Sequence, residues 1–485
     1  MTNRNIILNV DSYKASHYLQ YPANTSEVSS YIEARGGQFK QSVFFGLQMF
    51  IKEYLSKPIT NDDIEEAKAV IEAHGLPFNE AGWRYIVDEY DGYLPIEIEA
   101  LPEGYVVPVK NAMVQVINTD PNCAWLTSYV ETALLRAVWY PTTVATVSWN
   151  CKKVIQRFME ETADSLDGLD FKLHDFGARG ATTEEAAAIG GAANLVNFMG
   201  TDTISGILAA RRYYSPKNGI LEMPGFSIPA AEHSTITSWG KDNEKEAYAN
   251  MLEQFSGPDK LVAVVSDSYD LWNAIENIWG DELKEKVQRS GGTLVIRPDS
   301  GDPVNIVTET IERLMQNFGY EVNDKGYRVL PSYVRVIQGD GVSLQTIEAI
   351  LNAMKLRMQS AENIAFGMGG ELLQKVNRDT MKFAMKASAA KVDGLWRDVF
   401  KDPITDAGKR SKKGRLAVVQ DTNGQVKTIR AQDLGNKENL LQVVYRNGVL
   451  LKEYDFDEVR ANAASASQST DQKENNKKES STQVA

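Results

Sequence analysis

After about residue 170 the chain alternates between short apolar runs and longer amphipathic segments. The runs are rich in Val and Ile and do not alternate with polar residues: VAVVSDSYD (262–270), TLVIRPDSGD (293–302), VRVIQGDG (334–341) and NIAFGMGG (363–370). Continuous apolar runs are typical of parallel strands buried on both faces. They recur roughly every 30 to 40 residues, which is the spacing of strand–helix units.

Three segments that follow these runs carry apolar residues at helical spacing. The helical positions are Leu271, Ile275, Ile278 and Trp279 in the first; Val307, Ile311, Leu314 and Phe318 in the second; and Ile347, Ile350, Leu351, Met354 and Met358 in the third. We interpret the methionine-bearing stripe as core packing rather than a ligand site. Repeated strand-then-helix units predict an α/β fold, and we expect a (β/α) barrel.

The two ends of the chain have a different pattern. Residues 1–150 mix short strands, such as IEIEALPEGYVVPV (96–109), with helical stretches, and residues 414–455 again favour strands. Asn447-Gly448 within that stretch predicts a hairpin turn. We therefore expect a barrel-like catalytic domain over 151–384. A second, mixed α+β domain is then formed by 1–150 together with 385–460.

Composition narrows the range of partners. The 485 residues carry a formal net charge of −13, which argues against nucleic acid or an anionic membrane as a partner. No apolar stretch approaches the roughly 20 residues of a membrane span. Two cysteines give neither a disulfide framework nor a paired metal motif and favour a reducing, cytoplasmic compartment. The polar residues 464–485 predict a disordered tail.

Polar residues and glycines follow each apolar run at the position where its strand should end. In a parallel barrel these ends meet on one face, which is where active sites form. The residues are Asp267 and Asp270, Arg297 and Asp299, Gly339 and Asp340, and Gly369 and Gly370. The motif LHDFGARG (173–180) fits the same description if the residues FKL (171–173) form its strand.

Each of these motifs has an ordinary structural explanation as well. The glycines of IAFGMGGELLQK (364–375) could bind phosphate at a helix N-terminus or simply form a tight turn. In RPDSGDP (297–303), Asp299 could bind ribose hydroxyls or hold Mg²⁺ through water, or the motif could provide a salt bridge and a helix cap at Ser300 or Asp302. His233 could be structural or catalytic. The P-loop, HExxH, CxxC and GxSxG motifs do not occur.

The motifs together identify a family resemblance. DSYKASHYLQYP (11–22), LHDFGARG, NFMGTDT (197–203), IPAAEHSTITSWG (228–240), VVSDSYD, IRPDSG, VIQGDG, AFGMGGELLQK and KDP…KRSKKGR occur in this order. They resemble the nicotinamide phosphoribosyltransferases, which are type II phosphoribosyltransferases of NAD salvage. The likeness covers roughly residues 5–460.

The resemblance implies both a fold and a reaction. The fold is an irregular α/β barrel with a second domain, in a homodimer whose active sites lie at the interface. The reaction joins nicotinamide to 5-phosphoribosyl 1-pyrophosphate (PRPP) and gives nicotinamide mononucleotide and pyrophosphate. Mg²⁺ is implied as a cofactor, bound mainly through pyrophosphate and water rather than by direct protein ligands. ATP is implied as an optional stimulant.

The resemblance also assigns the nicotinamide site. Phe176 would stack on one face of the ring and Tyr13 of the partner subunit on the other. Asp202 would accept a hydrogen bond from the amide, and a nicotinate carboxylate would be repelled by it. Three more residues would belong to this site, and they are Arg179, Ser227 and Arg297.

The sugar and phosphate positions come from the same resemblance. The ribose side is implied to include Asp267, Asp299, Gly339 and Asp340. The 5′-phosphate is implied to bind at Gly369, Gly370 and Arg378. The pyrophosphate is implied to bind at Arg35, Lys386 and Lys401.

His233 matches the family histidine that ATP phosphorylates, and with Asp267 and Asp299 it makes up the expected catalytic group. Two other interpretations stay open at this point. The chain could use nicotinic or quinolinic acid on the same fold, although those acids would favour a basic residue at 202. It could also be a binding or signalling protein without turnover. A barrel aldolase would need a Schiff-base lysine at a strand end, and the quoted strand ends have none.

Overall fold

The computed structural model describes residues 5–405 and 410–465, which form two compact units. Unit 1 consists of residues 1–146, 212–221 and 376–485, as far as they are described, and unit 2 consists of 147–211 and 222–375. The first boundary falls inside helix α5 (Glu131–Thr162), and the last falls at 375/376 rather than at the predicted 384/385. Of the predicted tail, 464 and 465 end a helix over 456–465, and 466–485 lie outside the described residues.

Unit 2 is built on a six-stranded sheet in which every neighbouring pair is parallel. In spatial order its strands are β7 (Gly200–Thr201), β6 (Leu173–Asp175), β13 (Ile364–Met368), β12 (Val334–Gln338), β9 (Thr293–Arg297) and β8 (Leu261–Val265). The predicted α/β fold is confirmed. The strand of the LHDFGARG motif begins at Leu173, later than the predicted 171, because Leu169–Phe171 form a 3-10 turn.

The two edges of this sheet are linked by one irregular segment, residues 226–230. Gly200 of β7 forms a parallel bridge with Phe226, and Ala263 of β8 forms one with Ala230. The backbone bonds are Thr201 N–H to Phe226 O at 2.9 Å and Ala263 N–H to Pro229 O at 2.9 Å. The segment therefore closes the curled sheet into an irregular barrel.

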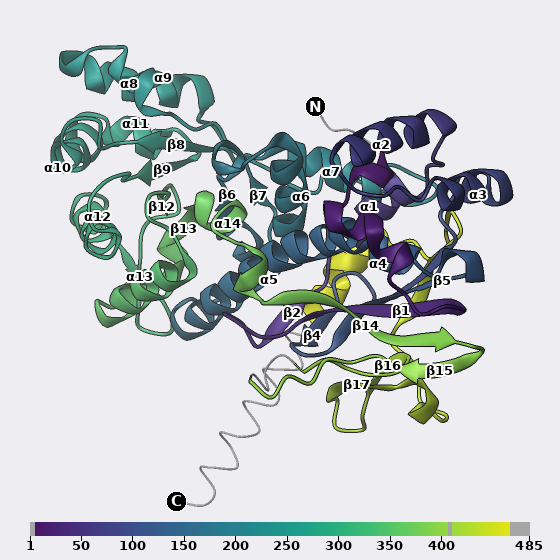
Figure 1. Ribbon diagram of the computed structural model, residues 1–485. Coiled ribbons are helices and arrows are strands. Elements are labelled where there is room, and N and C mark those ends of the chain that lie inside the picture. The colour runs from purple at the N-terminus through teal and green to yellow at the C-terminus, as the bar shows by residue number, and fades with distance from the viewer. Residues whose placement is uncertain (1–4, 406–409, 466–485) are drawn as a thin grey trace, which may run out of the picture. The chain divides into compact units, whose positions relative to one another are not determined.

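Helices cover the outside of the curled sheet (Figure 1). They are α6 (Glu184–Leu195), α9 (Glu244–Phe255), α10 (Leu271–Asn273), α11 (Lys284–Arg289), α12 (Pro303–Phe318) and α13 (Leu344–Leu356), with a π-helix over Ala274–Glu282. The predicted apolar faces of α12 and α13 are buried. Met358 does not belong to that face, because α13 ends at Leu356 and Met358 is exposed with a φ of 56°.

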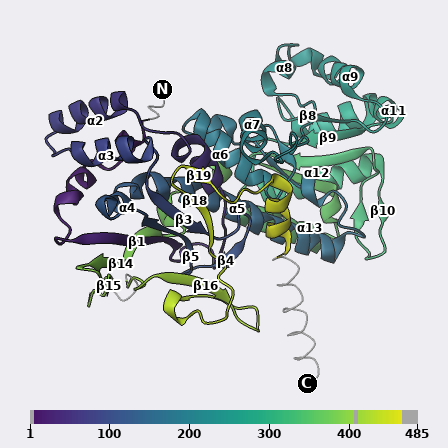
Figure 2. The same cartoon turned by 90° about the vertical axis from the view of Figure 1, so that its right-hand side faces the viewer.

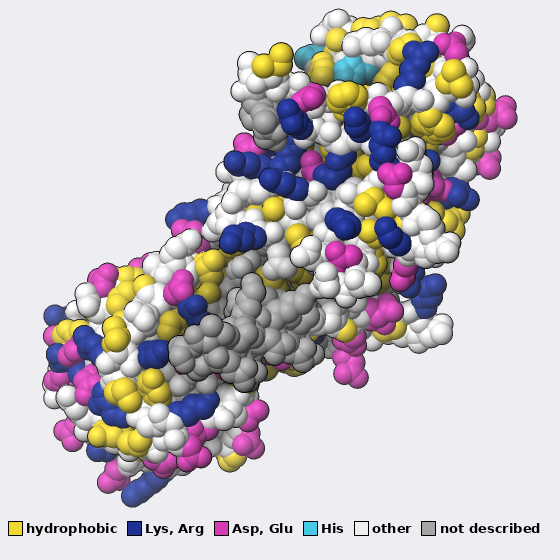
Figure 3. Space-filling model, turned by 90° about the horizontal axis from the view of Figure 1, so that it is seen from below, with side chains coloured by type: hydrophobic (Ala, Val, Ile, Leu, Met, Phe, Trp, Pro, Cys, Tyr) yellow, Lys and Arg dark blue, Asp and Glu magenta, His cyan; other side chains and the backbone are white. Residues whose placement is uncertain are grey.

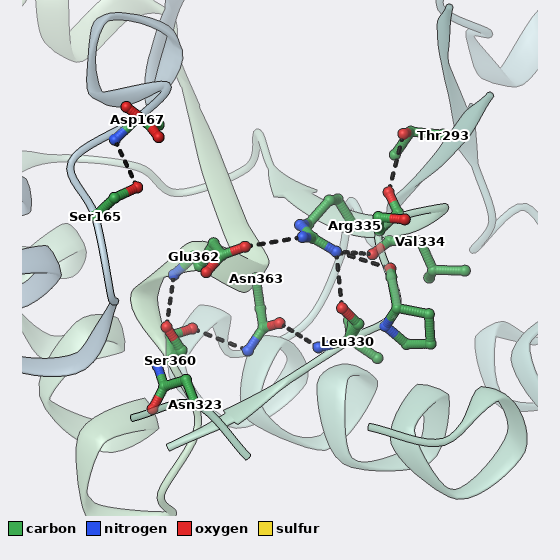
Figure 4. Close-up of polar contacts among 12 residues, drawn as sticks. Ser165, Asp167, Thr293, Asn323, Leu330, Val334, Arg335, Ser360, Glu362 and Asn363 are labelled. Carbon is green, nitrogen blue, oxygen red and sulfur yellow. Dashed lines mark hydrogen bonds and ion pairs between the residues drawn. The ribbon is translucent and has the colours of Figure 1, made fainter. Parts of the chain in front are cut away.

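Side chains from alternate strand positions fill the barrel in layers. Ala263, Val295 and Ile337 form a buried cluster, against which Phe176 and Ile228 pack. At the amino-terminal ends of the strands the interior is closed by polar contacts instead. Arg335 donates to the carbonyl oxygens of residues 330, 331 and 334 and to Glu362 Oε1 at 3.1 Å (Figure 4). Polar contacts therefore order the amino-terminal ends of the strands, opposite the carboxyl ends that carry the predicted residues.

Unit 1 is built on a seven-stranded antiparallel sheet. In spatial order its strands are β15 (Leu395–Asp398), β14 (Phe383–Val392), β1 (Thr25–Ala34), β5 (Ala112–Asn118), β3 (Ile96–Ala100), β18 (Gln442–Arg446) and β19 (Val449–Leu450). The predicted hairpin is present, since β18 and β19 pair across Asn447-Gly448, both with positive φ.

Two small sheets and several helices complete unit 1. The sheets pair β2 (Gln41–Val43) with β4 (Val106–Pro108), and β16 (Leu416–Gln420) with β17 (Val426–Arg430). The helices include α1 (Leu47–Phe50), α2 (Asn61–Ala73), α3 (Glu80–Tyr90) and α4 (Leu126–Tyr129). Helices α2 and α3 lie side by side (Figure 2).

The surface mixes charges of both signs. On the face drawn in Figure 3, Lys and Arg side chains are interspersed with Asp and Glu side chains, and hydrophobic side chains occur in small groups. In the part of the chain that the structure describes, none of the helices combines the length and the apolar character that a membrane span requires. An anionic ligand would therefore depend on a local group of cations rather than on the overall charge of −13.

Candidate active site

The carboxyl ends of the six parallel strands bring the predicted residues of unit 2 to one edge of the sheet. Phe176 follows β6, Asp202 follows β7, Gly369 follows β13 and Gly339 follows β12. The remaining strands place Arg297 and Asp299 at the end of β9 and Asp267 beyond β8. Parallel pairing puts these ends side by side, which is the arrangement from which barrel active sites are built.

The Phe176 ring lies across the ends of β13 and β12. Its backbone N–H donates to Met368 O at 3.0 Å. A Cβ atom added at Gly367 would lie only 2.0 Å from the ring, and one at Gly339 would lie 3.3 Å from it. The ring is half-buried. One face of the ring therefore contacts the protein, and the other face is available for stacking with a flat ligand.

Asp202 lies next to this ring in the order of strands and interacts with the segment that closes the barrel. Ser227 of that segment donates its hydroxyl to Asp202 Oδ1. The backbone N–H of Asp202 donates to Asp175 O at 2.9 Å, which ties the start of the β7 loop to β6. Asp202 and Ser227 are both exposed, so a carboxylate and a hydroxyl are both offered to an amide-sized ligand group.

Two neighbouring titratable groups are buried beneath the site. Burial raises the pKa of Asp175 to about 6, although the Gly177 N–H and the Thr203 hydroxyl oppose the rise, and the charge of Asp202 adds to it. Burial lowers the pKa of His174, against the opposing effect of Asp202. A Cβ atom at Gly200 would lie 2.7 Å from the His174 ring, so His174 is packed against β7 rather than presented to a ligand.

His233 is held by carboxylates from two strand ends. It begins the short helix α8 (His233–Thr237), and its Nε2 lies 2.9 Å from Asp267 Oδ1. Its Nδ1 lies 4.0 Å from Asp299 Oδ2, which is also 3.7 Å from an Arg297 nitrogen. Asp267 is nearly buried, with a side-chain exposure of 5%, while His233 is 47% exposed. The buried Asp267 carboxylate thus orients the imidazole, while about half of the His233 side chain stays accessible.

Ser300 supports the same group, in a role that differs from the predicted one. Its hydroxyl donates to Asp267 Oδ2 at 2.5 Å, so each oxygen of Asp267 has its own donor. Of the two caps considered for α12, the structure has Asp302, whose Oδ1 accepts from Asn305 N–H at 3.0 Å. The RPDSGDP motif predicted the helix cap. Nothing near Ser300 in the sequence predicted that its hydroxyl would contact a carboxylate that follows another strand.

The other residues of unit 2 have looser surroundings. Gly370 begins the short helix α14 (Gly370–Leu373), and a Cβ atom there would contact nothing within 4 Å. Asp340 is exposed, and its carbonyl oxygen accepts from the Gln338 amide at 2.7 Å. Arg179 is exposed in a 3-10 turn. The open space at Gly370 suits the close approach of a ligand, because packing does not demand a glycine there.

Five predicted residues belong to unit 1: Tyr13, Arg35, Arg378, Lys386 and Lys401. Arg35 Nε lies 3.4 Å from Glu33 Oε1, yet among the described residues this Nε and one terminal nitrogen of Arg35 have no hydrogen-bond partner, although both atoms are buried. Burial lowers the pKa of Lys386; Glu131 opposes this, and Arg35, Lys14 and Lys401 add to it. The pKa of Lys386 is thus lowered by other cations of unit 1 as well as by burial, which is the electrostatic setting that suits an anionic ligand.

Tyr13 and Arg378 lie at the surface of unit 1. The Tyr13 ring is 58% exposed and meets the His17 ring edge to face, with centroids 5.1 Å apart. Arg378 is exposed and pairs with Asp379 at 3.2 Å. Both side chains therefore present much of their surface to solvent in the single subunit.

Comparisons with known proteins agree with these observations. Residues 171–449 match the model of the nicotinate phosphoribosyltransferase (NAPRTase) family, and residues 5–98 match the nicotinamide phosphoribosyltransferase N-terminal domain. The chain is 53% identical over 468 residues to a nicotinamide phosphoribosyltransferase of Xanthomonas campestris, covering 95% of this chain and 98% of that protein. It is 32% identical to one of Acinetobacter baylyi, covering 94% and 96%.

Solved structures share the fold at low sequence identity. The nicotinate-nucleotide pyrophosphorylase of Pyrococcus furiosus has a TM-score of 0.60 at 15% identity and covers 96% of this chain and 97% of its own. Human nicotinic acid phosphoribosyltransferase has a TM-score of 0.53 at 16% identity, with coverages of 94% and 92%. At these identities the likeness bears on the fold alone.

Proposed function

The chain belongs to the nicotinamide phosphoribosyltransferase family, and on that premise we propose that it joins nicotinamide to PRPP. The enzyme is a pentosyltransferase, and its products are nicotinamide mononucleotide and pyrophosphate. The observation that carries the choice of base is the exposed Asp202 carboxylate, which follows the strand next to the one that leads to Phe176 and accepts a hydrogen bond from Ser227. An acid at this position accepts a hydrogen bond from the amide NH₂ of nicotinamide.

Nicotinate phosphoribosyl transfer is the alternative on the same fold. The family model over residues 171–449 takes its name from that reaction. A nicotinate carboxylate at this site would meet the Asp202 carboxylate, and like charges at short range disfavour binding. Asp202 therefore supports nicotinamide over nicotinic acid, and it does so by rejecting the acid as well as by accepting the amide.

The reaction needs no nucleophile from the protein. The pyridine nitrogen forms a bond to C1 of the ribose while the bond from C1 to pyrophosphate breaks, and the electron pair leaves with pyrophosphate. Positive charge develops on the sugar as the bonds exchange, and the carboxylates of Asp267 and Asp299 stabilise it if they lie beside the ribose. Phe176 and Tyr13 hold the base in line for attack, which supplies much of the remaining rate enhancement.

The anionic parts of PRPP would be held by cations and backbone groups. We assign the 5′-phosphate to Gly369, Gly370 and Arg378, and the ribose hydroxyls to Gly339 and Asp340 together with Asp299. Arg35, Lys386 and Lys401 would hold pyrophosphate, and the two buried Arg35 nitrogens without a hydrogen-bond partner among the described residues support this assignment. This local set explains how a chain with net charge −13 could bind a polyanion.

Mg²⁺ fits the same arrangement as a metal bound mainly through substrate. The described residues contain no group of three or more His, Cys, Asp or Glu that could hold a metal alone. Asp267 and Asp299 nevertheless both approach His233 and offer the oxygen ligands that Mg²⁺ prefers. The ion would be held mainly by pyrophosphate and water, with these carboxylates reaching it through water, and when bound it would neutralise the leaving group.

We propose that His233 is the residue that ATP phosphorylates. The bond from Nε2 to Asp267 selects the tautomer with the proton on Nε2, which leaves a lone pair on Nδ1. We propose that Nδ1 forms a bond to the γ-phosphorus while the bond to the bridging oxygen breaks and ADP leaves. A phosphohistidine beside the ribose site would change the charge that pyrophosphate meets and so favour product formation.

We also propose a homodimer in which Tyr13 of one subunit completes the site of the other. The Tyr13 ring supports this, because 58% of the residue is exposed in the single subunit. We place the enzyme in the cytoplasm. The free cysteines Cys123 and Cys151 are buried, and burial raises the pKa of each thiol to about 12, as suits inert thiols in a reducing compartment.

The proposal is tested by product analysis of the purified full chain with PRPP and Mg²⁺. Nicotinamide should give nicotinamide mononucleotide and one pyrophosphate per turnover. Nicotinic acid should give at least tenfold less product, because a charge repulsion of about 1.4 kcal/mol corresponds to a factor of ten. A preference for nicotinic acid would show that the chain catalyses nicotinate phosphoribosyl transfer instead. If neither base gives product, the chain would be a binding protein without turnover.

A further inference from the structure

The Phe176 ring is held from below by Gly367, a residue to which no function has been assigned so far. Gly367 lies in β13 opposite His174 of β6. A Cβ atom there would lie 2.0, 2.2 and 2.7 Å from three atoms of the Phe176 ring, and protein Cβ atoms do not approach other atoms so closely. The φ of Gly367 is not in the left-handed region, so the strand itself would accept alanine. The ring is the reason that a side chain is excluded.

Asp175 supports the loop that carries the same ring. Its carboxylate is fully buried, and Oδ1 accepts the Gly177 N–H at 2.7 Å, which fixes the turn just after Phe176. Its carbonyl oxygen accepts the Asp202 N–H at 2.9 Å. One buried residue therefore links the loop that carries the ring to the loop that carries the acid.

The interior of the barrel completes the support. Phe176 packs on the buried cluster of Ala263, Val295 and Ile337, which are small or β-branched and so form a compact layer under the ring. Together with Gly367 this layer lets the ring lie over the strand ends. A ring lifted by even one methyl group would present its face at a different height to the Asp202 carboxylate.

We propose that Gly367 and Asp175 are positioning residues that set the place of the Phe176 ring relative to Asp202, and through it the affinity and choice of base. This inference rests on the proposed function. Neither residue needs to touch the base: Gly367 acts by having no side chain, and the Asp175 carboxylate acts through the Gly177 N–H. The bond-making groups are unaffected, so the effect should appear in base binding rather than in the chemical step.

A double-mutant cycle tests the role of Gly367. Gly367→Ala should raise the KM for nicotinamide about fivefold to tenfold, the range expected for loss of one ring stacking, while the KM for PRPP and kcat at saturation change less than about twofold. Phe176→Leu removes the ring with which the new methyl group collides. In that background Gly367→Ala should have almost no further effect on the KM for nicotinamide.

Gly280→Ala serves as the matched control. A Cβ atom there would lie 2.7 Å from the Asn317 side chain, so this substitution also crowds a buried glycine of unit 2, but between a π-helix and α12. It should change the melting temperature without raising the KM for nicotinamide selectively. A rise in that KM equal to the one in Gly367→Ala would show a general packing effect and overturn the inference.

Asp175 is tested by a pair of variants, which also covers the case in which Gly367→Ala fails to fold. Asp175→Asn keeps an oxygen that can accept the Gly177 N–H, whereas Asp175→Ala does not. Asp175→Ala should raise the KM for nicotinamide about tenfold and narrow the preference over nicotinic acid, and Asp175→Asn should restore most of both. Equal losses in the two variants would remove Asp175 from this role.

Failure of the inference can be told apart from failure of the proposed function. If the wild-type enzyme makes no nicotinamide mononucleotide, the proposed function fails before any variant is compared. If the wild type is active, the decisive comparison is the factor by which Gly367→Ala raises the KM for nicotinamide in the wild-type and in the Phe176→Leu backgrounds. An equal factor in both would mean that the ring is not the intermediary, and only the inference would then fail.

Discussion

At the scale of single residues, the site depends on carboxylates whose surroundings differ. Asp267 is nearly buried with a donor on each oxygen, Asp202 is exposed beside a serine hydroxyl, and Asp175 is buried and accepts the Gly177 N–H. The same side chain therefore orients a histidine, meets the ligand and supports a loop. Burial and hydrogen-bond donors decide between these roles, and sequence position alone does not.

The His233 assignment predicts a selective loss. His233→Ala should abolish stimulation by ATP, so that the ratio of initial rates with and without ATP falls to about one, because the variant has no imidazole to accept the γ-phosphoryl group. The measurement is that ratio, together with ³²P transfer from γ-labelled ATP to the protein. Label retained in the variant would contradict the assignment.

The buried carboxyl of Asp175 predicts a pH-dependent stability difference. The folded pKa of about 6 lies above the ordinary value of 3.8, so the folded protein favours the protonated carboxyl. The stabilisation of the folded state by this group is therefore complete below about pH 3.8 and is lost as pH rises through 6. The free energy of unfolding of Asp175→Asn, measured relative to that of wild type, should therefore rise by about 3 kcal/mol between pH 4 and pH 7.5. Melting temperatures across this range measure it.

Ser148→Ala provides the control for this pH dependence. Ser148 is buried in unit 2 and donates to Asn194 Oδ1 at 2.8 Å, but it does not titrate. Its difference from wild type should be the same at every pH. A difference between Asp175→Asn and wild type that is equally flat would show that Asp175 keeps an ordinary pKa in the folded protein.

The sequence indicated most residues of the site but not those that support them. Asp267, Asp299 and the glycines follow apolar runs, and a parallel sheet brings such ends together whatever the details of packing, whereas Asp202 was indicated by the family resemblance. Gly367 and Asp175 lie inside the same motifs without a signal of their own. Their roles depend on where the Phe176 ring rests, which is set by contacts between strands far apart in the sequence.

At the scale of elements, the loop between strand β9 and helix α12 contains one acid that serves the proposed reaction and another that stabilises the helix. Asp299 points toward His233, and Asp302 caps the helix. The two acids are three residues apart, so they form a matched pair within one loop. Their substitutions should have opposite consequences.

Asp302→Ala should destabilise unit 2 by about 1 kcal/mol, the usual value of an N-cap, and leave kcat/KM within about twofold of wild type. Asp299→Ala should lower kcat/KM by at least about a hundredfold, on the order expected for losing charge stabilisation in the transition state, with little change in melting temperature. Thermal unfolding and steady-state kinetics on both variants provide the comparison. A larger activity loss in Asp302→Ala would reverse the two assignments.

Local pattern predicted the regular elements and missed the irregular ones. The strands at 262–265, 293–297, 334–338 and 364–368 and the faces of α12 and α13 follow from two-faced burial and helical spacing. The closing segment 226–230 forms only isolated bridges and contains Pro229, so nothing in its own sequence marks a strand. Its pairing is imposed by the edges of the sheet that it joins.

At the scale of the whole molecule, we propose that residues from two subunits serve one reaction. Tyr13, Arg35, Lys386 and Lys401 belong to unit 1, whereas Phe176 and the carboxylates belong to unit 2. The proposed homodimer supplies Tyr13 from the partner. This division predicts that two damaged subunits can complement each other.

Mixing Tyr13→Ala with Phe176→Leu subunits, after unfolding and refolding together, should restore activity. Each variant alone lacks one stacking ring in both sites, while each mixed dimer has one intact site, so roughly a quarter of wild-type activity is expected from random pairing. Light scattering on the same samples should show a dimer. Activity of the mixture equal to the average of the separate variants would contradict a shared site.

The central claim, that Asp202 selects nicotinamide for transfer to PRPP, is tested most directly by one ratio. The ratio is kcat/KM with nicotinamide over kcat/KM with nicotinic acid, measured for wild type and Asp202→Asn. We expect wild type to prefer nicotinamide strongly. The ratio should fall at least about tenfold in Asp202→Asn, because the substitution removes the charge that repels nicotinic acid. A ratio unchanged by the substitution would contradict the claim.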